Sequence, residues 1–266
     1  MATTDRVLES RKAARPDDTV IHYSISGPAE GPAVVLIHGW ACNRTDFDGV
    51  TGFLPGEYRV IAVDLAEHGE SRSARDRWTM EEFARDVAEV LDVEAVADCV
   101  VVGHSLGGAV AVELGRLRPG TVRHIVALDA LHYLFLFGAL DEEQAEGLLR
   151  PLHADFAGLV RDMVEAGSPP GTDPALKDAH FRKMAAVRQP AGTKAFEGLV
   201  AWDMEGALTD VKQPITVFGV RELVTQEALD RLGNRIDVVL VDLGSHHFPV
   251  ESPEATAALI TGVVSA

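Results

Sequence analysis

The chain is poor in several features whose presence would define a class of protein. Its 266 residues include only two cysteines, Cys42 and Cys99, which form no CxxC or Cys/His cluster, so neither a disulfide framework nor a zinc site is indicated. No segment approaches the roughly 18 to 20 consecutive apolar residues of a membrane helix. Residues 1–20 carry charges throughout and have no apolar signal-peptide centre. We therefore expect a cytoplasmic protein with no membrane partner.

Basic residues are also scarce. Lys and Arg total 24 against 41 Asp and Glu, which gives a net charge of −17. A polyanion is repelled by such a field, so nucleic acid is not an expected partner. Hydrophobic residues make up 47% of the chain, enough for a large core, and this argues against intrinsic disorder. The length fits one domain with an insertion.

Short β-branched runs alternate with longer helical patterns along most of the chain, which is typical of a parallel sheet covered by helices. The interior runs are continuously apolar, as strands buried on both faces must be. This predicts an α/β fold with a doubly wound, mostly parallel sheet. The expected strands are residues 19–24, 33–37, 59–63, 99–102, 124–128, 215–218 and 237–241.

The segment 131–202 interrupts this alternation. It is helix-like, rich in Leu, Ala and Glu, and broken by Ser168-Pro-Pro-Gly171 and Gln189-Pro-Ala-Gly192. Because open parallel sheets bind ligands at their strand ends, we interpret 131–202 as a helical cap over that edge. Residues 1–130 and 203–266 would then form the core, and a second domain is the alternative.

The sequence Gly103-His-Ser-Leu-Gly107 is a G-x-S-x-G motif between an apolar strand and a helix expected from Ala109 to Leu117. In this context the glycines permit a tight, strained turn that exposes the serine hydroxyl at the strand tip. The helix that follows directs its N-terminal dipole at the same place. Ser105 is the predicted nucleophile.

A serine hydroxyl needs an adjacent base at neutral pH. The sequence Leu243-Gly-Ser-His-His-Phe-Pro249 follows the last expected strand, where a loop can place an imidazole on the serine. Neighbouring side chains point in different directions, so only one of the two histidines is expected to reach Ser105. We select His247, which precedes Phe-Pro, over His246.

The imidazole in turn needs a carboxylate that fixes its tautomer. Two acidic residues lie between Ser105 and His247 at strand ends. Asp129 ends the strand after the nucleophile helix, and Glu222 follows the penultimate strand. We favour Asp129 slightly, since a buried strand holds a carboxylate more rigidly than a loop.

The sequence Leu36-Ile-His-Gly-Trp40 ends another buried strand. Its glycine lets the backbone approach a substrate, and the amides of Trp40 and Leu106 are the expected oxyanion hole. Trp40 and His38 are assigned to the substrate pocket, with His38 orienting the loop. The apolar stretch Leu131-His-Tyr-Leu-Phe-Leu-Phe137 is expected to wall the pocket with Phe135 and Phe137, which favours an apolar or aromatic small molecule as substrate.

Together these residues resemble the α/β-hydrolase superfamily over nearly the whole chain. The resemblance rests on the His38-Gly-Trp40, Asp64-Leu-Ala-Glu-His-Gly-Glu-Ser71, Gly103–Gly108 and Gly244–Pro249 segments. It implies hydrolysis of an ester, lactone or thioester by Ser105, His247 and an acid, without a cofactor or metal. Two departures stand out: Gly219-Val-Arg-Glu222 replaces the usual G-x-x-D, and Glu67 precedes His68 where the family usually has glycine.

The missing Asp after the penultimate strand, with Asp129 ending the strand before it, is also similar to cofactor-independent dioxygenases of this fold that cleave 3-hydroxy-4-oxoquinolines. There a His-Asp pair deprotonates the substrate hydroxyl and the dianion reacts with oxygen directly. This is the alternative function. A catalytically inactive binding protein on the same scaffold ranks last, because Ser105 and His247 are both present.

Overall fold

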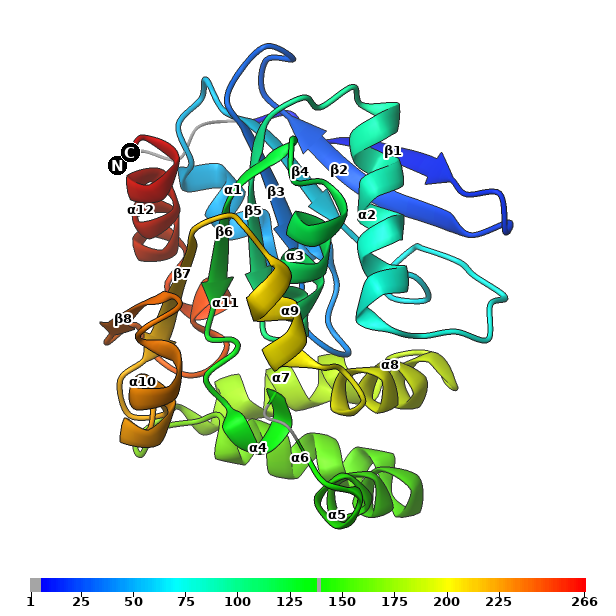
Figure 1. Cartoon of the computed structure of the whole chain (residues 1–266), viewed down its shortest axis with the longest axis vertical. Helices are drawn as coiled ribbons and strands as arrows, with labels where there is room; N and C mark the ends of the chain where they lie inside the picture. Colours follow the sequence, from blue (N-terminus) through cyan, green and yellow to red (C-terminus); the bar gives the residue numbers. More distant parts are fainter. Residues whose placement is uncertain (1–5, 138–139) are drawn as a thin grey trace.

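An eight-stranded sheet forms the centre of the molecule (Figure 1). The structure, a computed structural model, describes residues 6–137 and 140–266. The strands, in chain order, are β1 (Glu9–Ala14), β2 (Val20–Ser26), β3 (Ala33–Ile37), β4 (Arg59–Val63), β5 (Cys99–His104), β6 (Val122–Leu128), β7 (Ile215–Val220) and β8 (Asp237–Val241). They lie in the order β1-β2-β4-β3-β5-β6-β7-β8, and all pairs from β4 to β8 are parallel. The predicted α/β fold with a mostly parallel sheet is confirmed.

The antiparallel strand β1 at one edge of the sheet is missing from the sequence prediction. Its sequence, Glu-Ser-Arg-Lys-Ala-Ala, has no apolar run, and only Ala13 is buried. An edge strand presents one side to water and tolerates charged residues, so neither composition nor periodicity marks it. Strands β5 and β7 also run two residues further than expected, to His104 and Val220.

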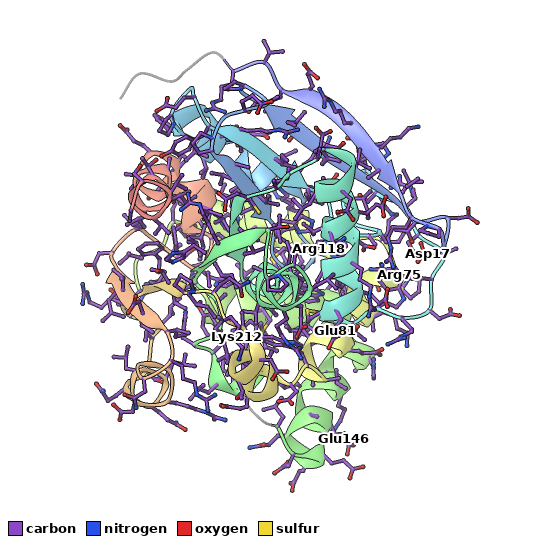
Figure 2. The ribbon with its side chains drawn as sticks, turned by 45° about the horizontal axis from the view of Figure 1, so that its top comes forward. Asp17, Arg75, Glu81, Arg118, Glu146 and Lys212 are labelled. Carbon is purple, nitrogen blue, oxygen red and sulfur yellow. The ribbon has the colours of Figure 1, made fainter. Side chains whose placement is uncertain are left out.

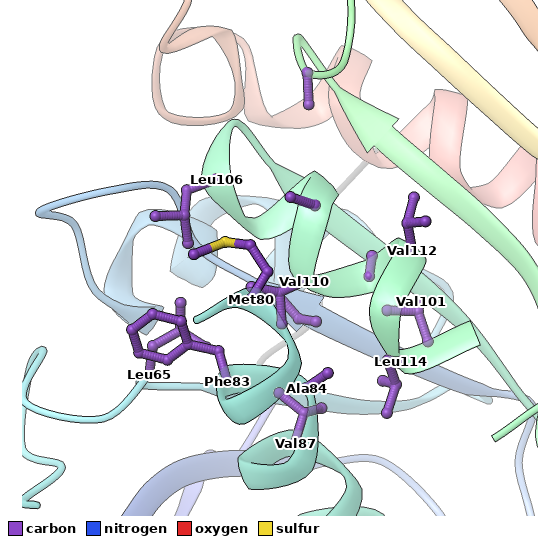
Figure 3. Close-up of a cluster of buried hydrophobic side chains, with 14 of the residues drawn as sticks. Leu65, Met80, Phe83, Ala84, Val87, Val101, Leu106, Val110, Val112 and Leu114 are labelled. Carbon is purple, nitrogen blue, oxygen red and sulfur yellow. The ribbon is translucent and has the colours of Figure 1, made fainter. Parts of the chain in front are cut away.

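Alternate residues of the central strands point to opposite faces of the sheet and pack into two separate hydrophobic layers. In β3, Val34 and Leu36 pack in one layer, whereas Val35 and Ile37 pack in the other. The first layer is completed by α1 (Asp48–Phe53) and α12 (Pro253–Val264). The second contains α2 (Met80–Val93) and α3 (Leu106–Leu117), whose Phe83 and Val110 belong to the buried cluster drawn in Figure 3. Burial on both faces explains the continuously apolar strands.

Helices inserted between β6 and β7 lie across the carboxyl ends of the parallel strands (Figure 1). They are α4 (Leu134–Phe137), α5 (Glu142–Ala154), α6 (Phe156–Ala166), α7 (Pro174–Ala185) and α8 (Ala191–Val200). We call α4–α8 the cap. Of the two segments noted in the sequence, Ser168-Pro-Pro-Gly171 lies between α6 and α7, and Gln189-Pro-Ala-Gly192 leads from the α7–α8 connection into the first turn of α8.

Shorter helices complete the fold outside the cap. They are the 3₁₀ helix η1 (Arg44–Phe47), α9 (Met204–Asp210), α10 (Gln226–Leu232) and α11 (Phe248–Glu251). Charged side chains such as Glu81, Glu146 and Lys212, labelled in Figure 2, are exposed to solvent. Within residues 6–137 and 140–266, no helix has the length and apolar character needed to cross a bilayer.

At Gly198 the backbone of the cap packs directly against the backbone of the core. A Cβ added at Gly198 of α8 would lie 1.9 Å from the carbonyl oxygen of Trp78, just before α2. We therefore expect Gly198→Ala to lower the free energy of unfolding by about 1 to 3 kcal/mol through overpacking. The matched control is Gly147→Ala in α5, where a Cβ meets nothing within 4 Å. It should raise stability by up to about 1 kcal/mol. Urea unfolding of both variants tests this, and equal effects would contradict the close packing.

Candidate active site

Ser105 occupies a strained turn between β5 and α3. Its backbone is left-handed, with φ of 53° and ψ of −121°. Glycines make the turn possible, because a Cβ at Gly103 would lie 2.0 Å from the Gly107 carbonyl oxygen. The Ser105 amide donates to the Leu128 carbonyl over 3.1 Å, which fixes the turn against the end of β6. This is the geometry expected of an exposed serine nucleophile.

Two backbone amides beside Ser105 are available to a ligand. The loop after β3 runs close to the serine, since a Cβ on Gly39 would lie 3.2 Å from the Ser105 Cβ. The amides of Trp40 and Leu106, the predicted oxyanion donors, make no hydrogen bond to any described residue. Unpaired amides beside a serine are what a developing oxyanion requires.

Asp129 is a fully buried carboxylate at the end of β6, with φ of 44°. Its Oδ1 accepts from the Val220 amide at 2.7 Å and from His132 Nε2 at 2.9 Å. Its Oδ2 accepts from His246 Nδ1 at 2.7 Å and from the Tyr133 hydroxyl. Burial alone would raise the pKa of Asp129, but the hydrogen bonds from His132 and His246 outweigh it and hold the pKa well below its usual range. Asp129 is therefore a carboxylate at neutral pH.

His246, and not His247, is the histidine that contacts Asp129. With Nδ1 donating to the carboxylate, Nε2 of His246 is left without a partner among the described residues, and His246 and Ser105 line one cavity. The loop is held by the His246 amide, which donates to the Gly167 carbonyl at 2.7 Å, and by His104 Nε2, which donates to the His246 carbonyl at 2.8 Å. The sequence prediction of His247 does not fit this geometry.

His247 also lines the cavity at Ser105, but its ring packs against the cap and is not bonded to Asp129. Its ring stacks on His180 of α7, with centroids 4.0 Å apart and planes at 17°, and His180 Nε2 lies 3.0 Å from Glu251 Oε1. Burial, with His246 and His180 nearby, lowers the pKa of His247 well below its usual value. His247 is a neutral packing residue between core and cap. Consecutive residues in a turn point in different directions, so the sequence could offer the pair but not choose between them.

Glu222, the other acid considered, lies on the surface. It is exposed in the turn after β7, in a shallow groove that also contains Arg221 and Asp242, and it bonds to no described histidine. The structure therefore brings Asp129, not Glu222, to the imidazole.

The cavity at Ser105 is small and largely apolar. Its volume is about 30 Å³, room for one or two waters, so the lining side chains must rearrange before a substrate can bind. The core contributes Trp40 and the histidine loop, and the cap covers it with side chains from four helices. These side chains are Leu136, Met163, Val164, Met184, Phe196 and Leu199.

Three residues predicted for the pocket wall lie elsewhere. Phe135 is 51% exposed, and Phe137 is buried edge-on against Trp202, with centroids 6.2 Å apart. Successive side chains of a helix diverge by about 100°, so Leu136 is the one that reaches the cavity. His38 is sealed beneath the loop: its Nδ1 donates to the Gly39 carbonyl at 2.7 Å, and its Nε2 accepts from the Leu65 amide at 3.0 Å. Burial lowers the pKa of His38 to about 3, so it is a neutral loop anchor.

Sequence reasoning missed two partners of Asp129. His132 and Tyr133 follow Asp129 by three and four residues, within the apolar stretch predicted from the sequence to wall the pocket. Their spacing of three and four residues from Asp129 was the available signal. No described group of His, Cys, Asp or Glu residues is arranged to hold a metal ion.

The low pKa of Asp129 predicts a pH-dependent contribution to stability. In the unfolded chain an aspartate has a pKa of about 3.9, above the pKa of Asp129 in the folded chain. As the pH falls through this interval the unfolded chain binds a proton that the folded chain does not, so stability is lost. Asp129→Asn lacks this proton uptake. Its deficit in unfolding free energy relative to wild type should be greatest above about pH 5 and should shrink below about pH 4. A deficit that stays constant from pH 7 to pH 3 would contradict the assignment.

Comparison with known proteins agrees with this architecture. A sequence model described as "Alpha/beta hydrolase family" matches residues 34–259. The 2-(acetamidomethylene)succinate hydrolase of Mesorhizobium japonicum is 27% identical over 268 residues, covering 95% of both chains. The esterase EaEST from Exiguobacterium antarcticum superposes with a TM-score of 0.83 at 16% identity, over 97% of this chain and 100% of the other.

Several other curated relatives match only in part. The uncharacterized protein Rv2715 of Mycobacterium tuberculosis is 40% identical over 111 residues, which are 41% of this chain and 31% of that protein. The chain thus spans about a third of the length of this relative, and such partial matches carry no conclusion about activity.

Proposed function

Because the chain belongs to the α/β-hydrolase family, we propose that it hydrolyses a carboxylic ester, lactone or thioester of a small apolar or aromatic molecule. The observation that carries this proposal is the bond between His246 Nδ1 and Asp129 Oδ2 beside a cavity that Ser105 also lines. This arrangement leaves His246 Nε2 as the base for the serine proton. The apolar cap residues around the cavity support an apolar or aromatic substrate.

The proposed reaction has two halves. In the first, His246 Nε2 takes the Ser105 proton as Oγ attacks the carbonyl carbon, and the amides of Trp40 and Leu106 stabilise the oxyanion. The imidazolium then protonates the leaving group, and an acyl-serine remains. In the second half, His246 deprotonates a water molecule that attacks the acyl carbon, and it then returns this proton to Ser105 Oγ as the C–Oγ bond breaks and the acid leaves. Asp129 holds the imidazole in the required tautomer and stabilises its positive form, and the reaction requires no cofactor.

A second function has a specific observation in its favour. The carboxylate that meets His246 comes from the end of β6, as in the cofactor-independent dioxygenases, and Ser105 Oγ has no hydrogen bond to a described residue. In that reaction His246 would deprotonate the hydroxyl of a 3-hydroxy-4-oxoquinoline, and the dianion would react with oxygen. Ser105 would then be dispensable. The two functions differ in their need for this serine.

Replacement of the serine and of each neighbouring histidine separates these roles. With p-nitrophenyl esters, Ser105→Ala and His246→Gln should each lower kcat/KM by about 10⁴-fold or more, since each removes a group that acts in the transition state. His247→Gln is the matched control and should retain activity within about tenfold, because its ring lines the cavity but stacks on His180 and has no bond to Asp129.

Oxygen uptake with 3-hydroxy-4-quinolones is measured on the same variants. Uptake that persists in Ser105→Ala and is lost in His246→Gln would overturn ester hydrolysis in favour of the dioxygenase. Loss of ester hydrolysis in His247→Gln but not in His246→Gln would reverse the choice of base.

The two acids give an independent test of the proposed triad. Asp129→Asn should lower kcat by up to about 10⁴-fold, because the amide no longer compensates the imidazolium or fixes its tautomer. Glu222→Gln should leave kcat nearly unchanged, as surface substitutions usually do. Both variants are assayed with one ester, and a large loss in Glu222→Gln alone would contradict the assignment.

A further inference from the structure

Glu67 is an unusual residue for its backbone conformation. It has φ of 59°, a left-handed conformation that suits the glycine usual at this place in the family's motif. Both oxygens of its carboxylate are used. Oε1 accepts from the Ser73 amide at 2.7 Å, and Oε2 accepts from Arg188 Nε at 2.9 Å. A strained residue with a fully engaged side chain indicates a function for that side chain.

Arg188 lies in the cap, between α7 and α8, and every nitrogen of its guanidinium contacts the loop 67–71 of the core. Besides Glu67, it donates through NH1 to the Gly69 carbonyl at 3.0 Å and through NH2 to the Ser71 carbonyl at 2.7 Å. The planar fork of an arginine matches three acceptors that a lysine could not bind together. Arg188 is 36% exposed, so this contact depends on its geometry more than on its charge.

The same core loop, taken back to Asp64 and Leu65, is bonded to the segment His38-Gly-Trp40 after β3, which we call the oxyanion loop. The Leu65 amide donates to His38 Nε2 at 3.0 Å, and His38 Nδ1 donates to the Gly39 carbonyl at 2.7 Å. Asp64 stiffens the connection, because its Oδ2 accepts from the Glu70 amide at 2.8 Å and its carbonyl accepts from Ser71 Oγ at 2.7 Å. The position of the Trp40 amide is therefore tied to the loop that Arg188 holds.

A further hydrogen bond returns from the oxyanion loop to the cap. Trp40 Nε1 donates to the Gly192 carbonyl at 2.7 Å, and the Gly192 amide donates to the Arg188 carbonyl at 3.0 Å. Gly192 lies in the first turn of α8, the helix that places Phe196 and Leu199 in the cavity. The bonds thus form a closed ring that passes from cap to core and back.

We propose that Glu67 and Arg188 are positioning residues that lock α8 of the cap to the oxyanion loop and so set the size of the substrate that the site accepts. In this role Arg188 fixes the start of α8, and with it one wall of the cavity, while Glu67 holds the guanidinium in place. The size selectivity rests on the proposed ester hydrolysis, whereas the locking of α8 does not.

Hydrogen exchange tests the lock without any substrate. In Arg188→Met and Glu67→Gly, the amides of residues 188–200 should exchange about tenfold faster than in wild type, while those of α3 stay unchanged. Arg188→Lys keeps the charge but lacks the fork, and it should resemble Arg188→Met. The control is Arg118→Met, which removes a similarly exposed arginine, bonded to Asp92 and labelled in Figure 2, outside the cap.

Unchanged exchange in residues 188–200 for both Arg188→Lys and Glu67→Gly would overturn the proposal. Faster exchange throughout the protein would overturn it as well, because Glu67 and Arg188 would then stabilise the whole fold and not α8 in particular. The Glu67→Gly variant keeps the test open if Arg188→Met fails to fold, since glycine relieves the strained backbone.

The selectivity is measured on p-nitrophenyl acetate and octanoate. Loosening α8 should raise the ratio of kcat/KM for octanoate over acetate several-fold in Glu67→Gly and Arg188→Lys, and leave it unchanged in Arg118→Met. An equal loss for both esters would mean that the lock does not set size. If neither ester is cleaved by the wild type, the proposed hydrolysis fails, and the exchange experiment still decides the lock.

Discussion

The arrangement of this site depends on keeping one carboxylate charged in the protein interior. Asp129 has no exposed surface, and an isolated charge there would be costly. The fold satisfies it with donors from three parts of the chain: the Val220 amide of β7, His132 and Tyr133 at the entry to the cap, and His246 after β8. Each donor is thereby placed relative to the others. The hydrogen bond that stabilises the buried charge of Asp129 is therefore the same bond that orients the imidazole of His246.

The parallel sheet explains why these groups meet. Strands β5, β6 and β7 are neighbours, so Ser105, Asp129 and the Val220 amide leave the same edge. The cap is inserted directly after Asp129, which brings Tyr133 to the carboxylate and Leu136 to the cavity within a few residues. Charge compensation and enclosure of the site thus come from one segment of chain.

The sequence was sufficient where local pattern determines structure. Continuous apolar runs predicted the central strands, and the glycines around Ser105 predicted the turn that the structure contains. It was insufficient where orientation is set by distant contacts. Whether His246 or His247 faces Asp129 depends on bonds from Gly167 and His104 to the loop, and Phe137 faces Trp202 because of how a short helix packs. Strand β1 was not predicted because an exposed edge strand needs no apolar pattern.

The central claim is that the Nδ1 proton of His246 is bonded to Asp129, and NMR of ¹⁵N-histidine-labelled protein tests it most directly. The account predicts a low-field imidazole N–H resonance that disappears in both His246→Gln and Asp129→Asn, and persists in His247→Gln and Glu222→Gln. A resonance that survives in His246→Gln and is lost in His247→Gln would contradict it.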